Sequence, residues 1–277
     1  MLQHFARIFI LSMLILPATA NLPARAQSFY GVFNNPVTLR VDTASAVFSI
    51  INGVTTNTLQ IVLTNTSTFS TYGNNDLLSG LFFAIATSPT LTPLEATTPS
   101  ILQPDLCDAP HDTTTCLGTS VNVGKEFAFQ YSATGFNAPE LVTAGQYGIG
   151  AAGYNFMSPN FGAQVAAFGA SPPLLTSGGS VGGLDFSIVG AAYNAAASAN
   201  SVSSQPLSNT SVTFKFGLPT GVSTLSISNV SFAYGTNPDG STVATSGVPE
   251  PAGLALFGLA LAGLAGVRYR CRMTGVG

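Results

Sequence analysis

The sequence predicts an all-β protein whose body is an antiparallel β-sandwich of jelly-roll-like type. In several segments apolar residues recur at every second position, which is typical of strands with one buried and one wet face. Gly, Pro, Asn and Ser separate these segments, and no convincing amphipathic helix precedes the C-terminal tail. Short strands divided by such turns can bury their apolar faces only by packing two sheets together.

The alternation is clearest in residues 58–64, 127–132 and 212–218, where apolar side chains take one parity and mostly polar ones the other. Further strands are expected at 37–41, 46–50, 81–86, 184–189 and 225–234. The dipeptide Asn52-Gly53 lies between two of these segments and predicts a hairpin. Residues 88–118 and 169–183 are rich in Pro, Ser, Thr and Gly and are expected to be long loops.

The segment 225–234 changes phase along its length. Leu225 and Ile227 share one parity, whereas Val230, Phe232 and Tyr234 share the other. One extra residue near Ser228-Asn229 restores the pattern, so we expect a β-bulge or a tight turn there.

The body between the two ends of the chain is poor in charge. Charged residues make up 7% of the 277-residue chain, and 46% of it is hydrophobic, which suits a packed core rather than a disordered chain. Residues 21–247 hold four cationic and ten acidic side chains, a net charge of −6. Nucleic acid needs clustered Lys and Arg and is therefore an unsuitable partner, whereas a neutral polyhydroxylated partner suits such a surface.

The N-terminus has the layout of a secretory signal peptide. Arg7 is followed by the apolar run Ile8–Leu16 and then by Ala18-Thr19-Ala20, which fits the A-x-A pattern of a cleavage site. The apolar run is too short to span a bilayer. We expect residues 1–20 to be the signal peptide, with Ala26 as an alternative end, and residues 27–235 to be the body.

The C-terminus has a second targeting layout, joined to the body by an expected polar linker at 236–247. Val248-Pro249-Glu250-Pro251 precedes an uncharged apolar run of sixteen residues, Ala252–Val267. This run predicts a short transmembrane helix. A basic stop-transfer cluster follows it, which the positive-inside rule places in the cytoplasm: Arg268, Arg270 and Arg272.

This order of elements closely resembles the PEP-CTERM sorting signal of bacterial surface proteins, over about residues 248–272. The resemblance implies that Pro249, Glu250 and Pro251 are recognised by exosortase, a membrane-embedded cysteine enzyme, and that the chain is its substrate. It also implies an inner-membrane intermediate before the body reaches the cell surface or the extracellular space. A plain membrane anchor is the alternative reading of the tail. The stretch 211–235 is also similar, more weakly, to the terminal strands of other exosortase-dependent proteins.

The three cysteines fit export. Cys107 and Cys116 lie in a turn-rich stretch, and outside the cytoplasm they form a candidate disulfide, whereas Cys271 lies behind the apolar run. The alternative is that the first two are unrelated small residues. An acidic group beside them lacks an EF-hand pattern and is read as a solvated loop rather than a calcium site: Asp105, Asp108, His111 and Asp112.

Two catalytic-looking motifs lack their required context. Residues 148–153 fit G-x-G-x-x-G, but no acid lies about 20 residues further on, so a strand or turn is expected. Residues 178–182 fit G-x-S-x-G, but no histidine follows Ser180. Three glutamates remain formal candidates for glycoside hydrolysis without a recognisable context: Glu95, Glu126 and Glu140.

We therefore expect a non-enzymatic exported surface or matrix protein, without cofactor or metal, that is processed by exosortase and associated with exopolysaccharide or biofilm. The alternative is a secreted carbohydrate-binding module or polysaccharide-active enzyme on the same scaffold. The absence of Trp disfavours a sugar-stacking platform, although eight Tyr could serve.

Overall fold

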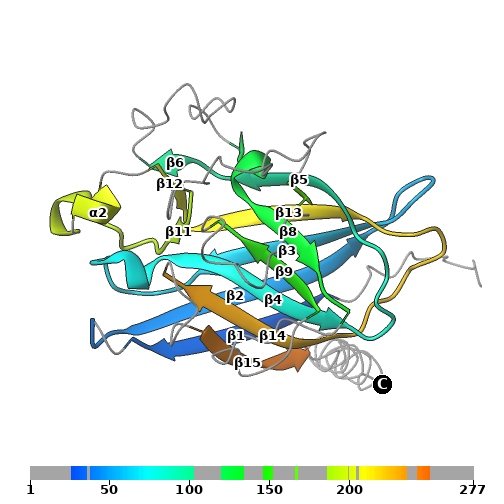
Figure 1. Ribbon diagram of the computed structural model, residues 1–277, viewed down its shortest axis with the longest axis horizontal. Helices are drawn as coiled ribbons and strands as arrows, with labels where there is room; N and C mark the ends of the chain where they lie inside the picture. Colours follow the sequence, from blue (N-terminus) through cyan, green and yellow to red (C-terminus); the bar gives the residue numbers. More distant parts are fainter. Residues whose placement is uncertain are drawn as a thin grey trace, which may run out of the picture.

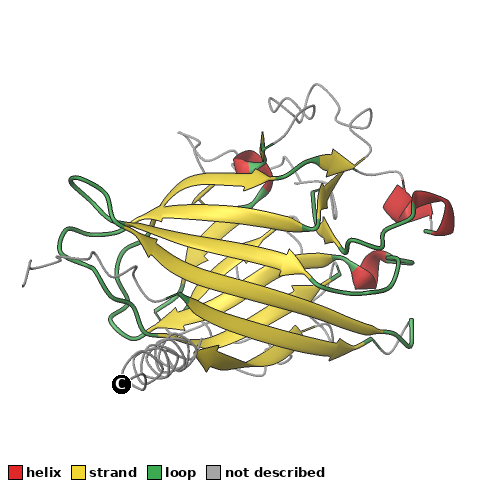
Figure 2. Cartoon of the chain, turned by 180° about the vertical axis from the view of Figure 1, so that it is seen from behind, coloured by secondary structure: helices red, strands yellow, loops and turns green. Residues whose placement is uncertain are grey.

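The computed structural model describes residues 26–35, 38–102, 120–133, 146–151, 166–167, 186–198, 200–203, 206–235 and 242–249. Within these residues fifteen strands form one continuous sheet that folds into two facing layers (Figures 1 and 2). All pairings but one are antiparallel, the exception being β11 with β12. The predicted all-β class is confirmed.

The first layer contains, in spatial order, β1 (Gln27–Asn34), β2 (Val41–Ile51), β3 (Thr58–Asn65), β13 (Ser211–Gly217), β5 (Thr92–Thr98) and β7 (Val121–Asn122). The second contains β10 (Ala166–Ala167), β8 (Ala128–Tyr131), β9 (Tyr147–Gly150), β4 (Leu78–Ile85) and β14 (Ile227–Tyr234). The strand β15 (Thr242–Pro249) joins the layers, and a small extension on β4 holds β11 (Ile188–Val189), β12 (Leu207–Asn209) and β6 (Ile101–Leu102). Four short helical segments complete the described elements: η1 (Asn74–Asp76), η3 (Gly124–Glu126), η4 (Ala195–Ala197) and α2 (Asn200–Ser203).

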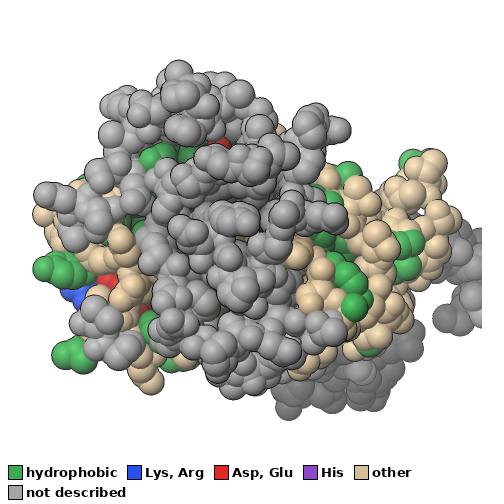
Figure 3. Space-filling model, viewed as in Figure 1, with side chains coloured by type: hydrophobic (Ala, Val, Ile, Leu, Met, Phe, Trp, Pro, Cys, Tyr) green, Lys and Arg blue, Asp and Glu red, His purple; other side chains and the backbone are tan. Residues whose placement is uncertain are grey.

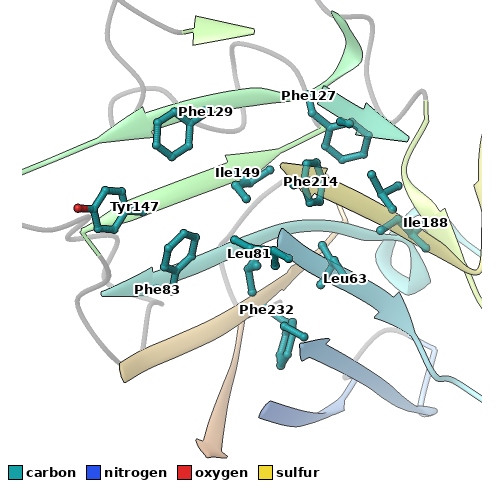
Figure 4. Packing of buried hydrophobic residues seen from close by; sticks show 14 of the residues in the cluster. Leu63, Leu81, Phe83, Phe127, Phe129, Tyr147, Ile149, Ile188, Phe214 and Phe232 are labelled. Atoms are coloured by element: carbon teal, nitrogen blue, oxygen red, sulfur yellow. The ribbon is translucent and has the colours of Figure 1, made fainter. Parts of the chain in front are cut away.

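The core lies between the layers and is rich in aromatic rings (Figure 4). Phe83 of β4 meets Phe48 of β2 edge to face, with ring centroids 5.2 Å apart. Two further contacts cross between the layers, Phe127 with Phe214 at 5.0 Å and Phe129 with Phe216 at 4.8 Å. Such pairs contribute about 0.5–1.5 kcal/mol each beyond the burial of their area. The aromatic contacts therefore fix how the two layers face each other.

The clearest alternating segments form the expected strands. Residues 58–64 lie in β3 and 211–217 form β13, each with its apolar parity buried. Residues 128–131 form β8, where Phe129 is buried as expected but Tyr131 of the same parity is exposed and Ala128 of the other parity is buried. The phase change in β14 is also confirmed, because its register against β4 shifts between Ser228 and Ser231 and Asn229 has a φ of 50°. Asn52-Gly53 lies in the connection between β2 and β3, which pair as a hairpin.

Two expectations in the N-terminal half were wrong. Within the expected strand at 37–41, residues 38–40 form a loop, where Leu39 is 88% exposed with a φ of 56° and donates its N–H to Asn35 O. This loop reverses the chain between β1 and β2. The expected loop at 88–118 contains β5 and β6. Pro93 is accommodated in β5 because the register against β13 shifts beside it.

The expected linker at 236–247 was also wrong in its second half, because Thr242–Pro249 forms β15. The first three residues of this strand pair with β14, and its last five pair with β1. The body of the protein therefore extends to Pro249 rather than ending near Gly235.

Candidate functional site

The first residue of the Pro-Glu-Pro motif is also the last residue of the sheet. Pro249 ends β15, where its register partner is Gln27, the first residue of β1. A proline fits this terminal position because it has no N–H to give to a ladder. Figure 1 shows β15 at the lower side of the sandwich, next to β14 and β1. The motif is thus attached directly to the folded body.

The strands beside Pro249 are tied together by one side chain. Gln27 Nε2 donates to Leu225 O at 2.6 Å, and Gln27 Oε1 accepts from Ile227 N at 3.1 Å. Because Leu225 and Ile227 lead into β14, this amide connects the start of β1 to the start of β14. The end of the sheet that carries the motif is therefore held by hydrogen bonds across both layers.

Several predicted site residues lie outside the described residues. These are Glu250 and Pro251 of the motif, the stop-transfer arginines Arg268, Arg270 and Arg272, and the disulfide candidates Cys107 and Cys116. The expected signal peptide, the apolar run 252–267 and the acidic group at 105–112 also lie there. Among the residues that are described, none of the helices is long and apolar enough to cross a membrane.

The candidate glutamates do not form a described pair of reactive carboxylates. Glu95 lies on β5 and accepts from Lys215 Nζ of β13 at 2.8 Å. Glu126 lies in η3 and is buried, while Glu140 lies outside the described residues. In the described part of the chain there is no group of three or more His, Cys, Asp or Glu that could hold a metal ion.

The glycine motif at 148–153 begins inside a strand. Tyr147–Gly150 forms β9 and pairs with β4 on one side and β8 on the other. Tyr147 and Ile149 point into the core, so the intervening Gly148 occupies the other parity. Residues 148–150 of the motif are therefore strand, as expected.

A buried pair of aspartates was missed at the opposite end of the sheet. Asp42 of β2 and Asp76 of η1 are 3% and 2% exposed. The side chain of Asn35 lies between them, and its Nδ2 is 2.7 Å from Asp76 Oδ1 and 3.3 Å from Asp42 Oδ2. The signal was available in the sequence, because Asp42 shares the buried parity of Ala44, Ala46 and Phe48.

The two acids have different surroundings. Asp76 accepts from Asn35 and Thr38 on one oxygen and from the N–H groups of Tyr72 and Gly73 on the other. The contacts of Asp42 are longer: Asn35 Nδ2 and Ser67 Oγ each lie 3.3 Å from one of its carboxylate oxygens. Burial, with Asp76 as the second cause, raises the pKa of Asp42 to about 6.

A phenol completes this cluster. Tyr234 of β14 is fully buried and stacks on Phe33, with ring centroids 5.7 Å apart. Burial raises the pKa of Tyr234, and the charges of Asp42 and Asp76 raise it further. The polar groups therefore lie inside the fold, where Asn35 and Thr38 of the β1–β2 loop donate to Asp76 of η1.

The outer face of the first layer is nearly uncharged. Its half-buried positions on the central strands carry mostly hydroxyls and amides: Thr43, Val47 and Ser49 on β2; Gln60, Val62 and Thr64 on β3; Ser211, Thr213 and Lys215 on β13. Figure 3, which is viewed as Figure 1, shows few Lys, Arg, Asp or Glu side chains among the described residues. The outer face of β2, β3 and β13 is therefore mostly polar and weakly charged.

Comparison with known proteins identifies the C-terminal segment. A family model described as the PEP-CTERM protein-sorting motif matches residues 247–270. Searches of curated proteins and of solved structures found no match to the chain. The matched segment begins within β15 and includes all three residues of the Pro-Glu-Pro motif. The chain therefore carries a PEP-CTERM sorting motif, which identifies it as an exported surface protein directed to exosortase.

Proposed function

We propose that this chain is a non-enzymatic component of the bacterial surface or extracellular matrix that is released from an inner-membrane intermediate by exosortase. The observation that carries the proposal is the sorting motif at 247–270, joined directly to a folded β-sandwich. The signal peptide at 1–20 takes the chain into the membrane, and the arginines after the apolar run stop its transfer. The body is the exported cargo.

Replacing Pro249, Glu250 and Pro251 together with Ala tests the processing step. The variant is expected to accumulate uncut in the inner membrane, since the enzyme loses the residues it recognises. The matched control is Pro238→Ala with Asp239→Ala, which removes a proline and an acid just upstream of β15. Membrane fractionation and the mass of the exported protein are the measurements. Normal release of the motif variant would contradict the proposal.

The polar outer face supports exopolysaccharide as the matrix partner. Hydroxyls and amides on a sheet face can exchange hydrogen bonds with a neutral polysaccharide at little desolvation cost compared with charged groups. Gln60 and Thr213 lie on neighbouring strands of this face, two register positions apart, since Thr213 pairs with Val62. A carbohydrate-binding role of the body follows from the same observation.

Replacing both Gln60 and Thr213 with Glu tests this face. The charged variant is expected to lose co-sedimentation with exopolysaccharide from the producing strain. Thr55→Glu with Thr56→Glu is the control, because both residues are exposed in the β2–β3 loop, away from the face. Equal co-sedimentation of both variants would show that this face does not bind the exopolysaccharide.

A further inference from the structure

The strand β15 is the connection between the two layers at one side of the sandwich. Thr242, Val243 and Ala244 pair with β14 of the second layer, whereas residues 245–249 pair with β1 of the first. Among the described strands, no other one pairs with both β1 and β14. Loss of β15 would therefore separate the layers along this side and leave two open strand edges.

The residues beside β15 belong to the core. In register, Gly247 lies opposite Phe29 of β1, and Val243 lies opposite Phe232 of β14. Phe29 is 7% exposed and Phe232 is fully buried. Opening the sheet here would bring water to core aromatics and leave backbone N–H and C=O groups of β1 and β14 without partners. The body thus depends on a segment that ends at the first residue of the sorting motif.

We propose that β15 stays with the exported body, so that exosortase cuts on the C-terminal side of Pro249. This inference rests on the proposed function. In the step, the peptide C–N bond after Pro249 or after one of the next few residues is broken. The acyl carbon passes to water or to an amine acceptor, and the leaving nitrogen takes up a proton. The tail departs with a free amino group, and the body keeps residues 242–249.

The first experiment locates the cut. The exported protein is purified from an exosortase-containing strain, its intact mass is measured, and its C-terminal peptide is sequenced. The expected peptide contains Val248-Pro249. A C-terminus at any residue from 236 to 248 would overturn this inference alone, since processing would still occur. Recovery of only the uncut chain would overturn the proposed function together with the inference.

The second experiment tests whether the body needs the strand. Thr245→Pro with Ser246→Pro removes two successive N–H groups, which point to opposite sides of a strand, so at least one faces β1. Thr245→Ala with Ser246→Ala is the matched control because it keeps both N–H groups. The proline variant is expected to show a lower Tm and faster proteolysis of the exported protein than the control. Equal Tm and protease resistance of the two variants would overturn the inference.

Discussion

The acidic residues that the sequence suggests as candidates for catalysis differ from those that the fold buries together. Glu95 has a neighbouring cation and partial exposure, whereas Asp42 and Asp76 share one amide in the interior. An exposed ion pair contributes little to stability, because water screens it. Burial of a carboxyl that accepts few hydrogen bonds instead raises its pKa, because the charged form is poorly stabilised. Stability measurements can therefore separate the two kinds of acid.

The Asp42 carboxyl makes stability depend on pH. Because its pKa is about 6 in the fold and 3.8 ordinarily, folding takes up a proton between about pH 4 and 6. The free energy of unfolding is expected to fall as pH rises through this window, by at most about 3 kcal/mol, and to level off above it. Asp42→Asn, which keeps a neutral donor facing Asp76, should flatten this slope in urea unfolding from pH 4 to 8. An unchanged slope would contradict the assignment.

The Glu95–Lys215 pair provides a contrasting case. Their side chains are 40% and 36% exposed, so Glu95→Gln is expected to lower the free energy of unfolding by less than about 1 kcal/mol. The difference from the parent should shrink further in high salt. Urea unfolding at low and high salt is the measurement. A loss of several kcal/mol would show that the pair is structurally essential.

Single elements explain which strands the sequence could predict. β3 and β13 were predictable because one face is buried and the other wet, so composition alternates. β1 was missed because apolar residues such as Tyr30 and Val32 occupy its outer parity too. β15 was missed because its eight residues alternate weakly, and its place is set by two strands far away in the sequence.

The bulge in β14 leads to a test of a single deletion. Asn229 and Val230 together oppose Phe83 of β4, between the pairs Ser228–Ala84 and Ser231–Phe82. Deleting Asn229 leaves Val230 to pair with Phe83, with all apolar residues still on the buried parity. We expect the free energy of unfolding to fall by less than about 1 kcal/mol, the range of mild substitutions.

Deletion of Gln60 from the regular strand β3 is the matched control. β3 has no bulge at this position, so the deletion shifts the strand by one residue. The part of the strand on one side of the deletion would then turn its apolar residues to water. This variant is expected to be degraded before or after export. Protease resistance and urea unfolding compare the two deletions. An equal loss of protease resistance and unfolding free energy in the two variants would show that the fold needs the bulge residue Asn229.

For the whole molecule, the sequence indicated the all-β class and the C-terminal sorting motif. The position of this motif relative to the strands could be seen only in the structure. The family match covers only residues 247–270, and periodicity says nothing about which distant strands meet. The buried aspartates likewise come together from β2 and η1, which are separate in sequence. Pairing between distant segments is the information that local pattern lacks.

The pairing of Gln27 with Pro249 brings the two ends of the body together. Partner residues in an antiparallel pair have Cα atoms about 4.5–5.5 Å apart, so a few glycines can join them. The body should therefore tolerate circular permutation, with new ends opened in the exposed β2–β3 loop at Val54. Such a protein, made without either membrane segment, would fold with β15 in the interior of its sequence. Folding of this permuted protein would show that the sandwich forms without the signal peptide at one end of the body and the sorting signal at the other.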